Sequence, residues 1–292
     1  MKIQYDVIII GAGHNGLVTA ALLAKAGKKV LVLEKRGILG GLAATEEIFP
    51  GYQFNTGASD SGMFRPEIIK ALDMTRYGLK FINAPVEVFN SQGENNSLTL
   101  WASNINQSIE DIKKHSDKDA DRYENYLNLA GKFSRIIQKA VLKTPPDLFN
   151  LKIRDALNWG PLAISARMLG GKKMMRLLRS LPMTAKEFLD EWFDSDILKA
   201  TLGGPSVTGS MQGPQSAGTT FMLLYQQIGK LNGGYRSAAI LKGGIGQLSN
   251  ILAEIAQKHA AEIRVNAGVK NIIVENSAVK GVITDNGEEI FA

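Results

Sequence analysis

The sequence predicts an α/β fold that opens with a parallel strand–helix–strand unit and returns to the same domain after a long, mostly helical insertion. Residues 5–10 and 29–34 are short β-branched or apolar runs, and the Ala- and Leu-rich residues 17–26 between them favour a helix. A second strand–glycine–helix–strand pattern covers residues 239–265, whereas residues 105–203 are mostly helical in pattern. Both ends of the chain are therefore expected to build one α/β domain.

The composition narrows the class of protein. The chain has 292 residues, 45% apolar and 21% charged, which is typical of one or two globular domains. The absence of cysteine excludes a disulfide scaffold, a thiolate zinc site and a redox cysteine pair. His14, His115 and His259 lie too far apart for a helical two-histidine metal site, so no metal is expected. No apolar run approaches the roughly 18 residues that span a bilayer, and Asp6 interrupts the apolar run of a signal peptide, so we expect a cytoplasmic protein.

A glycine-rich turn follows the first predicted strand. Gly11 permits the tight turn, Gly13 has no Cβ to block a pyrophosphate, and Gly16 lets the helix pack close to the sheet. His14 and Asn15 lie in the same loop and are candidate cofactor contacts. A pyrophosphate here would meet free N–H groups and the positive end of the helix dipole. The pattern predicts a Rossmann-type dinucleotide site; the alternative is a glycine-rich turn without a nucleotide.

An acidic residue ends the second predicted strand. Glu34 comes 18 residues after Gly16, where a carboxylate can accept hydrogen bonds from ribose hydroxyls. Lys35 and Arg36 follow and are included among the candidate cofactor-binding residues. They would suit a 2′-phosphate, but Glu34 would repel that group, so we interpret them mainly as solvated residues at the strand end.

A second pair of glycines, Gly40 and Gly41, comes six residues after the acid and is not part of the simple NAD pattern. Their backbone N–H groups could reach a diphosphate from its other side, and Thr45 could add a hydroxyl. The alternative is a flexible turn.

These motifs together resemble the phytoene desaturase and amine oxidase superfamily of FAD enzymes, and most closely its phytoene-dehydrogenase-like branch. The matching segments are 11–17, 39–41, 45–47, 50–52, 63–66, 186–193, 198–200 and 243–248. The resemblance implies FAD as the cofactor and implies that the backbone of Val269 pairs with the adenine edge. Leu42 departs from many amine oxidases and carotenoid desaturases, which place Arg after the glycine pair, so amine oxidase chemistry transfers less readily than FAD binding.

The resemblance also implies a domain organisation. We expect a Rossmann-type FAD-binding domain from residues 1–60 and 240–292, with an inserted α+β, largely helical substrate domain at 61–239. Family members continue beyond the point that matches Ala292, so the chain is expected to be an N-terminal portion of the fold. It would then be a truncated chain or one half of a split enzyme, with a missing C-terminal half or partner chain.

Within the insertion, residues 79–82, 86–89 and 98–101 predict short strands of an antiparallel sheet, and residues 119–142 predict one long helix. After the return unit, residues 269–291 predict a three-stranded meander.

A basic segment stands out within the helical region. Residues 132–179 contain eleven Lys or Arg and only two acids, Asp147 and Asp155, whereas the whole chain has a net charge of +6. Two interpretations remain open: a solvated basic face, or a peripheral membrane contact that would suit a lipophilic substrate. No nucleic-acid recognition motif accompanies the charge.

The predicted function is that of an FAD-dependent oxidoreductase, a dehydrogenase or desaturase that moves a hydride from a carotenoid-like or other lipophilic substrate to flavin. The alternatives are a non-enzymatic flavin-binding regulatory protein, half of a split enzyme, and an NAD-linked dehydrogenase. No catalytic residue can be named, since the cofactor carries this chemistry. Arg65 is a weak candidate beside the substrate, and Glu46 and Glu47 are candidates for support of the site.

Overall fold

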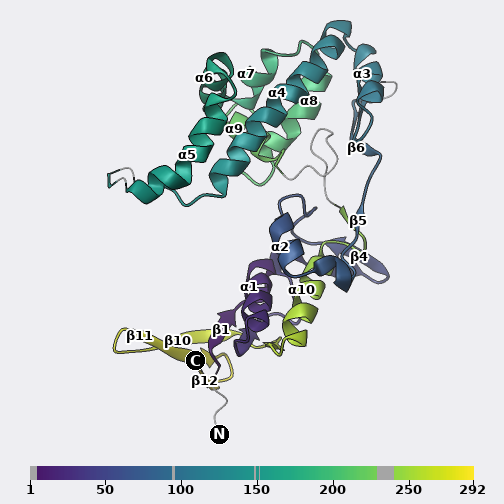
Figure 1. Ribbon diagram of the computed structural model, residues 1–292. Helices are drawn as coiled ribbons and strands as arrows, with labels where there is room; N and C mark the ends of the chain where they lie inside the picture. Colours follow the sequence, from purple (N-terminus) through teal and green to yellow (C-terminus); the bar gives the residue numbers. More distant parts are fainter. Residues whose placement is uncertain (1–4, 94–95, 148, 151, 229–239) are drawn as a thin grey trace. The chain divides into compact units, whose positions relative to one another are not determined.

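The computed structural model describes residues 5–93, 96–147, 149–150, 152–228 and 240–292. The chain forms two compact units, which divide between residues 83 and 84 and between residues 238 and 239 (Figure 1). The first boundary predicted from the sequence lies at 60/61. Residues 61–83 belong instead to the first unit, because Leu72, Met74 and Leu79 are buried in its core. The second predicted boundary, at 239/240, lies at the edge of the described residues. The strand predicted from residue 239 begins outside them.

The first unit is built on a parallel sheet. Strands β1 (Val7–Ile10), β2 (Val30–Leu33) and β9 (Glu262–Arg264) lie in that order, with β2 in the middle and buried along its whole length. Helix α1 (His14–Lys25) connects β1 to β2 and packs against α10 (Gly246–Lys258), which leads into β9. The predicted strand–helix–strand unit and the return to the same domain are therefore confirmed.

Small residues bring these two helices together. Ala20 and Ala21 of α1 are completely buried, as is Leu252 of α10. Because alanine side chains are short, the two helices can approach closely over the sheet and bury a shared apolar face.

Further short elements complete the first unit. Strands β3 (Thr45–Phe49) and β4 (Tyr52–Asn55) form a hairpin that the sequence analysis does not predict. The elements before the insertion also include the 3₁₀ turns η1 (Gly41–Ala43) and η2 (Met74–Tyr77) and helix α2 (Pro66–Ala71).

The predicted antiparallel sheet is only partly correct. Strand β6 (Val86–Ser91) pairs with β7 (Ser97–Trp101) in the second unit. Strand β5 (Phe81–Ile82) pairs instead with β8 (Ile240–Leu241), on the far side of the insertion and within the first unit. A two-residue strand carries too little pattern to reveal a partner about 160 residues away, which is why the sequence misassigned it.

The predicted meander is confirmed. Strands β10 (Val269–Glu275), β11 (Ala278–Thr284) and β12 (Glu289–Phe291) pair antiparallel in sequence order. Asn276 and Ser277, with φ of 49° and 63°, both adopt the left-handed conformation that a tight two-residue hairpin turn requires.

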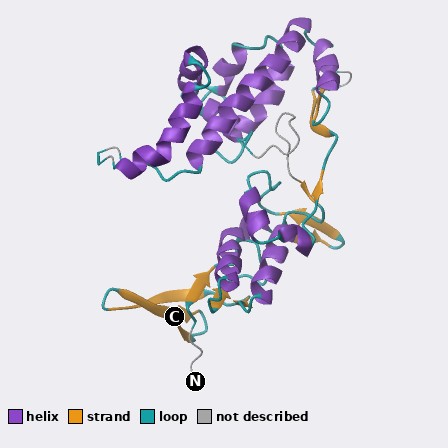
Figure 2. Ribbon diagram, viewed as in Figure 1, coloured by secondary structure: helices purple, strands orange, loops and turns teal. Residues whose placement is uncertain are grey.

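The second unit is mostly helical (Figure 2). Its long helix α4 (Asp117–Val141) confirms the predicted helix and buries Tyr123, Tyr126 and Phe133 in the core. The other elements of this unit are α3 (Ile105–Lys113), α5 (Ile153–Arg167), α6 (Gly171–Ser180), α7 (Ala185–Asp190), α8 (Asp196–Gly203), η3 (Gly204–Val207) and α9 (Thr219–Tyr225).

A buried carboxylate fixes the start of α8. Asp119, fully buried in the first turn of α4, accepts hydrogen bonds from the backbone N–H groups of Asp194 (2.9 Å) and Ser195 (2.7 Å). Ser195 is the N-cap residue of α8. These bonds satisfy donors that the helix cannot pair internally.

We expect Asp119→Asn to lower the free energy of unfolding by about 1–2 kcal/mol, because the amide keeps one acceptor oxygen and loses the other. Chemical denaturation of the variant measures this loss. The matched control is Asp121→Asn, two residues along the same helix and exposed, which should stay within about 0.5 kcal/mol of the parent. Equal stability of the two variants would contradict the role assigned to Asp119.

Candidate functional site

Three predicted motifs meet at one fully buried residue, Ala12. Its N–H donates to Oε2 of Glu34 at 2.8 Å, and its C=O accepts the N–H of Gly40 at 2.8 Å. The N–H of neighbouring Gly11 donates to the C=O of Leu33 at 2.7 Å. The first glycine turn, the end of β2 and the second glycine pair therefore form one hydrogen-bonded structure rather than three separate loops.

Three of the predicted site glycines have positive φ, a backbone conformation that other residues rarely adopt. Gly11 has φ of 95°, Gly40 has φ of 111° and Gly41 has φ of 57°. A Cβ on Gly40 would also lie 2.4 Å from the C=O oxygen of Ala43. The second pair is therefore a defined turn, and the alternative of a flexible turn is not what the structure contains.

Gly13 differs from these, because space lies in front of it. Its backbone is extended (φ −68°, ψ 167°), it bridges to Gly40, and a Cβ there would come no closer than 3.9 Å to a neighbouring atom, the Gly40 oxygen. Gly13 is also the N-cap of α1, and no side chain caps it. Uncapped N–H groups beside open space fit a diphosphate at this helix N-terminus.

Glu34 has a structural role that the sequence analysis does not predict. The residue is only 9% exposed, and Oε1 accepts the N–H of Arg36 at 2.9 Å while Oε2 accepts that of Ala12. Each carboxylate oxygen has two lone pairs, so one acceptor position remains on each for a ribose hydroxyl. The ribose contact stays a prediction.

Within the described residues, the side chains of the two basic residues after Glu34 form no ion pair with that carboxylate. The Arg36 guanidinium forms an ion pair with Glu46 of β3 at 2.7 Å, and Lys35 is exposed. The hydroxyl of Thr56, followed by the guanidinium of Arg36, lowers the pKa of Glu46. Arg36 thus links β2 to the hairpin, and Glu47 accepts the N–H of Gly51 at the hairpin turn.

Thr45 lies at the return loop. Its hydroxyl oxygen accepts the N–H of Gly246, the first residue of α10, at 2.8 Å, and donates to Oδ1 of Asn55 at 2.9 Å. The same Asn55 oxygen accepts the N–H of Ile245 at 3.0 Å. The predicted contact of Thr45 with a diphosphate remains a prediction, and its position shows that it joins the second glycine turn to α10.

We expect Thr45→Val to lower the free energy of unfolding by about 1–2 kcal/mol, because the isosteric side chain leaves the Gly246 N–H without its acceptor. Thr45→Ser keeps the hydroxyl and serves as the matched control, with stability close to that of the parent. Thermal unfolding of both variants measures the difference. A Thr45→Val protein as stable as Thr45→Ser would show that this bond contributes nothing.

Val269 begins β10, where it pairs with Thr284 and packs beside buried residues of β2. Two residues earlier, the N–H of Ala267 donates to the backbone carbonyl oxygen of Glu34 at 2.8 Å. The start of β10 is therefore near the ribose-binding candidate, whereas its backbone contact with adenine stays a prediction.

A cavity of about 310 Å³ adjoins the N-terminal turn of α1, within the first unit. Its polar lining comes from His14, Asn15, Asp60, Ser61 and Arg65, and its remaining walls are mostly apolar. This brings His14, Asn15 and the weak candidate Arg65 together. Its size is near the lower end of small-molecule pockets, so it would hold part of a dinucleotide or a small substrate.

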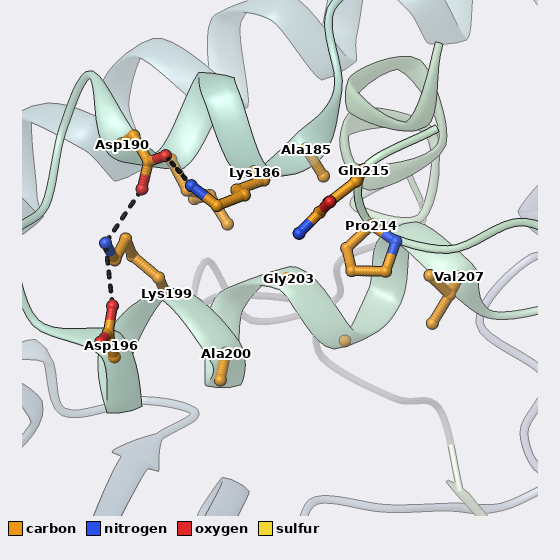
Figure 3. A pocket seen from close by; sticks show the side chains of 12 residues that line it. Ala185, Lys186, Asp190, Asp196, Lys199, Ala200, Gly203, Val207, Pro214 and Gln215 are labelled. Atoms are coloured by element: carbon orange, nitrogen blue, oxygen red, sulfur yellow. Dashed lines mark hydrogen bonds and ion pairs between the residues drawn. The ribbon is translucent and has the colours of Figure 1, made fainter. Parts of the chain in front are cut away.

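A second cavity of about 350 Å³ lies within the second unit, between α7, α8 and the 205–220 loop. At one end Lys199 pairs with Asp190 (2.9 Å) and Asp196 (3.0 Å), and Asp190 also pairs with Lys186 (Figure 3). The hydrogen bond to Asp190, and next that to Asp196, raises the pKa of Lys199. This ion-pair chain keeps the amine protonated, which makes it a structural feature rather than a catalytic base.

The described residues contain no group of three or more His, Asp or Glu side chains able to hold a metal ion. The candidate functional features are the predicted dinucleotide site, these two cavities and a third cavity of about 760 Å³ in the second unit, whose lining includes Thr144, Lys152, Arg154 and Asn158.

Comparison with known proteins supports a dinucleotide-binding domain at the start of the chain. Residues 9–64 match the family described as NAD(P)-binding Rossmann-like domain. The chain is 31% identical, over 99% of its length, to rat pyridine nucleotide-disulfide oxidoreductase domain-containing protein 2, of which it covers 52%. It is 29% identical, over 96% of its length, to a limonene dehydrogenase subunit of Castellaniella defragrans, of which it covers 48%. The chain thus spans about half the length of these curated relatives.

The fold matches as well. The chain aligns with a structure of putrescine oxidase bound to putrescine, with a TM-score of 0.56 and 19% sequence identity. The alignment covers 99% of this chain and 57% of the putrescine oxidase chain. The fold and the motifs agree, and they indicate FAD as the cofactor. These similarities confirm the predicted resemblance to the FAD-dependent oxidoreductase superfamily that includes the phytoene desaturases and amine oxidases.

Proposed function

We propose that this chain provides the adenosine- and diphosphate-binding part of an FAD-dependent dehydrogenase or desaturase that acts on an apolar substrate. The observation that carries the proposal is the hydrogen-bonded junction at Ala12, which joins the first glycine turn, Glu34 and Gly40. A simple NAD site would explain the first glycine turn and Glu34, but it would give no reason for the second glycine turn at Gly40.

The residues of the chain would divide the work of binding. Gly13 leaves room for the diphosphate at the start of α1, and the two oxygens of Glu34 accept ribose hydroxyls. Gly40 holds the second turn against the first, and Thr45 anchors that turn to α10. When bound, FAD supplies the hydride-accepting chemistry.

The apolar substrate class rests on two supports. Eight of the thirteen residues that line the 310 Å³ cavity are apolar: Val18, Ala43, Ala58, Met63, Phe64, Ile68, Ile245 and Leu248. One relative is named a limonene dehydrogenase subunit, and limonene is a hydrocarbon. Polar side chains such as Asp60 and Arg65 would then orient a substrate at the edge of the cavity rather than bind it along its length.

The test uses the intact protein, refolded with FAD, under anaerobic conditions. Limonene and a linear polyene are added separately, and visible absorbance records the reduction of the flavin. We expect bleaching with at least one of them and none with putrescine, a polar amine. A flavin that binds fully and stays oxidised with both hydrocarbons would overturn the proposed reaction while leaving FAD binding intact.

A further inference from the structure

Helices α5 and α6 carry large apolar side chains that are exposed. Leu157 and Met168 are 74% and 82% exposed, and Met175 and Leu178 are 61% and 55% exposed. The second unit has its core elsewhere, around α4, so these side chains are not part of that core. Scattered apolar residues on a surface are ordinary, but these lie on two consecutive helices.

On α5 the exposed apolar residues form one stripe. Ile153, Leu157 and Ile164, together with the C-cap residue Met168, recur at spacings that place them on the same side of the helix. The one buried residue of this helix, Leu162, lies on the opposite side, and α5 packs against α4 and α6 (Figure 1). The stripe therefore faces away from the packed side.

Cations flank the stripe. Arg154 and Arg167 lie on either side of it on α5, and Lys172 and Lys173 lie in the first turn of α6; all four are exposed. Within the described parts of the chain, no ion pair engages these four. Arg176 and Arg179 differ, because both pair with Glu191, and Arg176 also lies 4.5 Å from the centre of the Trp192 ring.

Among the described residues, the two acids of this segment form hydrogen bonds with backbone N–H groups and no ion pair with these cations. Asp147 accepts the backbone N–H groups of Phe149 and Asn150, and Asp155 accepts that of Lys152 at the start of α5. Both carboxylates are thus used to shape the chain before and at the helix N-terminus. The positive charges of Arg154, Arg167, Lys172 and Lys173 therefore remain exposed at the surface.

We propose that α5 and α6 form a docking surface for an anionic lipid bilayer. Basic residues beside an exposed apolar stripe match the two requirements of interfacial binding: attraction to anionic headgroups and burial of apolar side chains below them. Arg and Lys stems reach the headgroups while Leu, Ile and Met enter the acyl boundary without a fixed partner geometry. No described helix is long and apolar enough to cross a membrane, so binding would be peripheral. The inference uses only the second unit and does not depend on the proposed reaction.

The experiment is sedimentation of the intact protein with vesicles of phosphatidylcholine, alone or mixed with phosphatidylglycerol. We expect binding only to the mixed vesicles, and weaker binding as salt shortens the Debye length to about 3 Å near 1 M. Arg154→Gln and Lys172→Gln should each weaken binding about fivefold.

The apolar part has its own matched pair of variants. Leu157→Ser with Met168→Ser should weaken binding about tenfold or more. Val274→Ser with Val279→Ser, at positions 59% and 66% exposed on β10 and β11, should leave it unchanged. Circular dichroism confirms that each variant is folded.

Three results would overturn the proposal: no sedimentation with the mixed vesicles, full binding by the folded Leu157→Ser, Met168→Ser variant, or equal affinity for soluble polyglutamate. The last would mean a site for acidic polymers or proteins rather than for a bilayer.

Discussion

Gly13→Val is expected to abolish FAD binding while the protein stays folded. The extended backbone at Gly13 accepts any residue, and a Cβ there meets nothing nearer than the Gly40 oxygen at 3.9 Å. The added side chain would fill the space in front of the α1 N-terminus, where the diphosphate must approach the backbone. A side chain in that space would remove the contacts of the diphosphate with the helix N-terminus, so we expect affinity to fall below detection.

Quenching of FAD fluorescence measures the binding, and thermal unfolding measures the fold. Gly213→Val is the matched control, since the same side chain enters open space in a loop of the second unit. It should bind FAD like the parent. A folded Gly13→Val protein with parental affinity would show that the diphosphate does not pass this residue.

Gly16→Ala is expected to lower the free energy of unfolding by more than about 3 kcal/mol. A Cβ on Gly16 would lie 2.2 Å from the Gly11 oxygen and 3.3 Å from Cγ2 of Ile9. The Gly11 oxygen belongs to the backbone of the turn that leaves β1, so the contact can be relieved only if α1 moves away from the sheet.

Urea denaturation measures this loss. Gly131→Ala is the control, because Gly131 lies inside α4 and a Cβ there meets no atom within 4 Å. That change should stabilise the protein by about 0.5–1 kcal/mol, since alanine favours the helix more than glycine does. Gly16→Ala within about 1 kcal/mol of the parent would contradict the close helix–sheet contact.

The comparison of these glycines shows what the sequence can predict. The distinct roles of Gly11, Gly13 and Gly16 are predicted from their order between a strand and a helix. The structure confirms the turn at Gly11 and the close helix–sheet contact at Gly16, and the diphosphate contact of Gly13 stays a prediction. Strand β2 and helix α4 were also predictable, because the apolar residues that each element buries follow one another in a recognisable pattern along the sequence. The resemblance to FAD enzymes supplied what local pattern does not, the reason for the second glycine pair.

Other features depend on partners far along the chain. Thr45 accepts a hydrogen bond from Gly246, and β5 pairs with β8. In both cases the two partners are separated in the sequence by the whole inserted unit. The β3–β4 hairpin was missed because its strands are largely exposed and lack a buried face. Its only local signal was the turn at Pro50 and Gly51.

The central claim is that the junction at Ala12 builds a site for a flavin dinucleotide. The most direct test is the visible absorption spectrum of the intact protein after incubation with FAD and exhaustive desalting, with a parallel sample incubated with NAD. We predict that the protein retains flavin, that Gly13→Val does not, and that no NAD is retained. A folded protein that comes through desalting colourless, or that retains NAD instead, would contradict the claim.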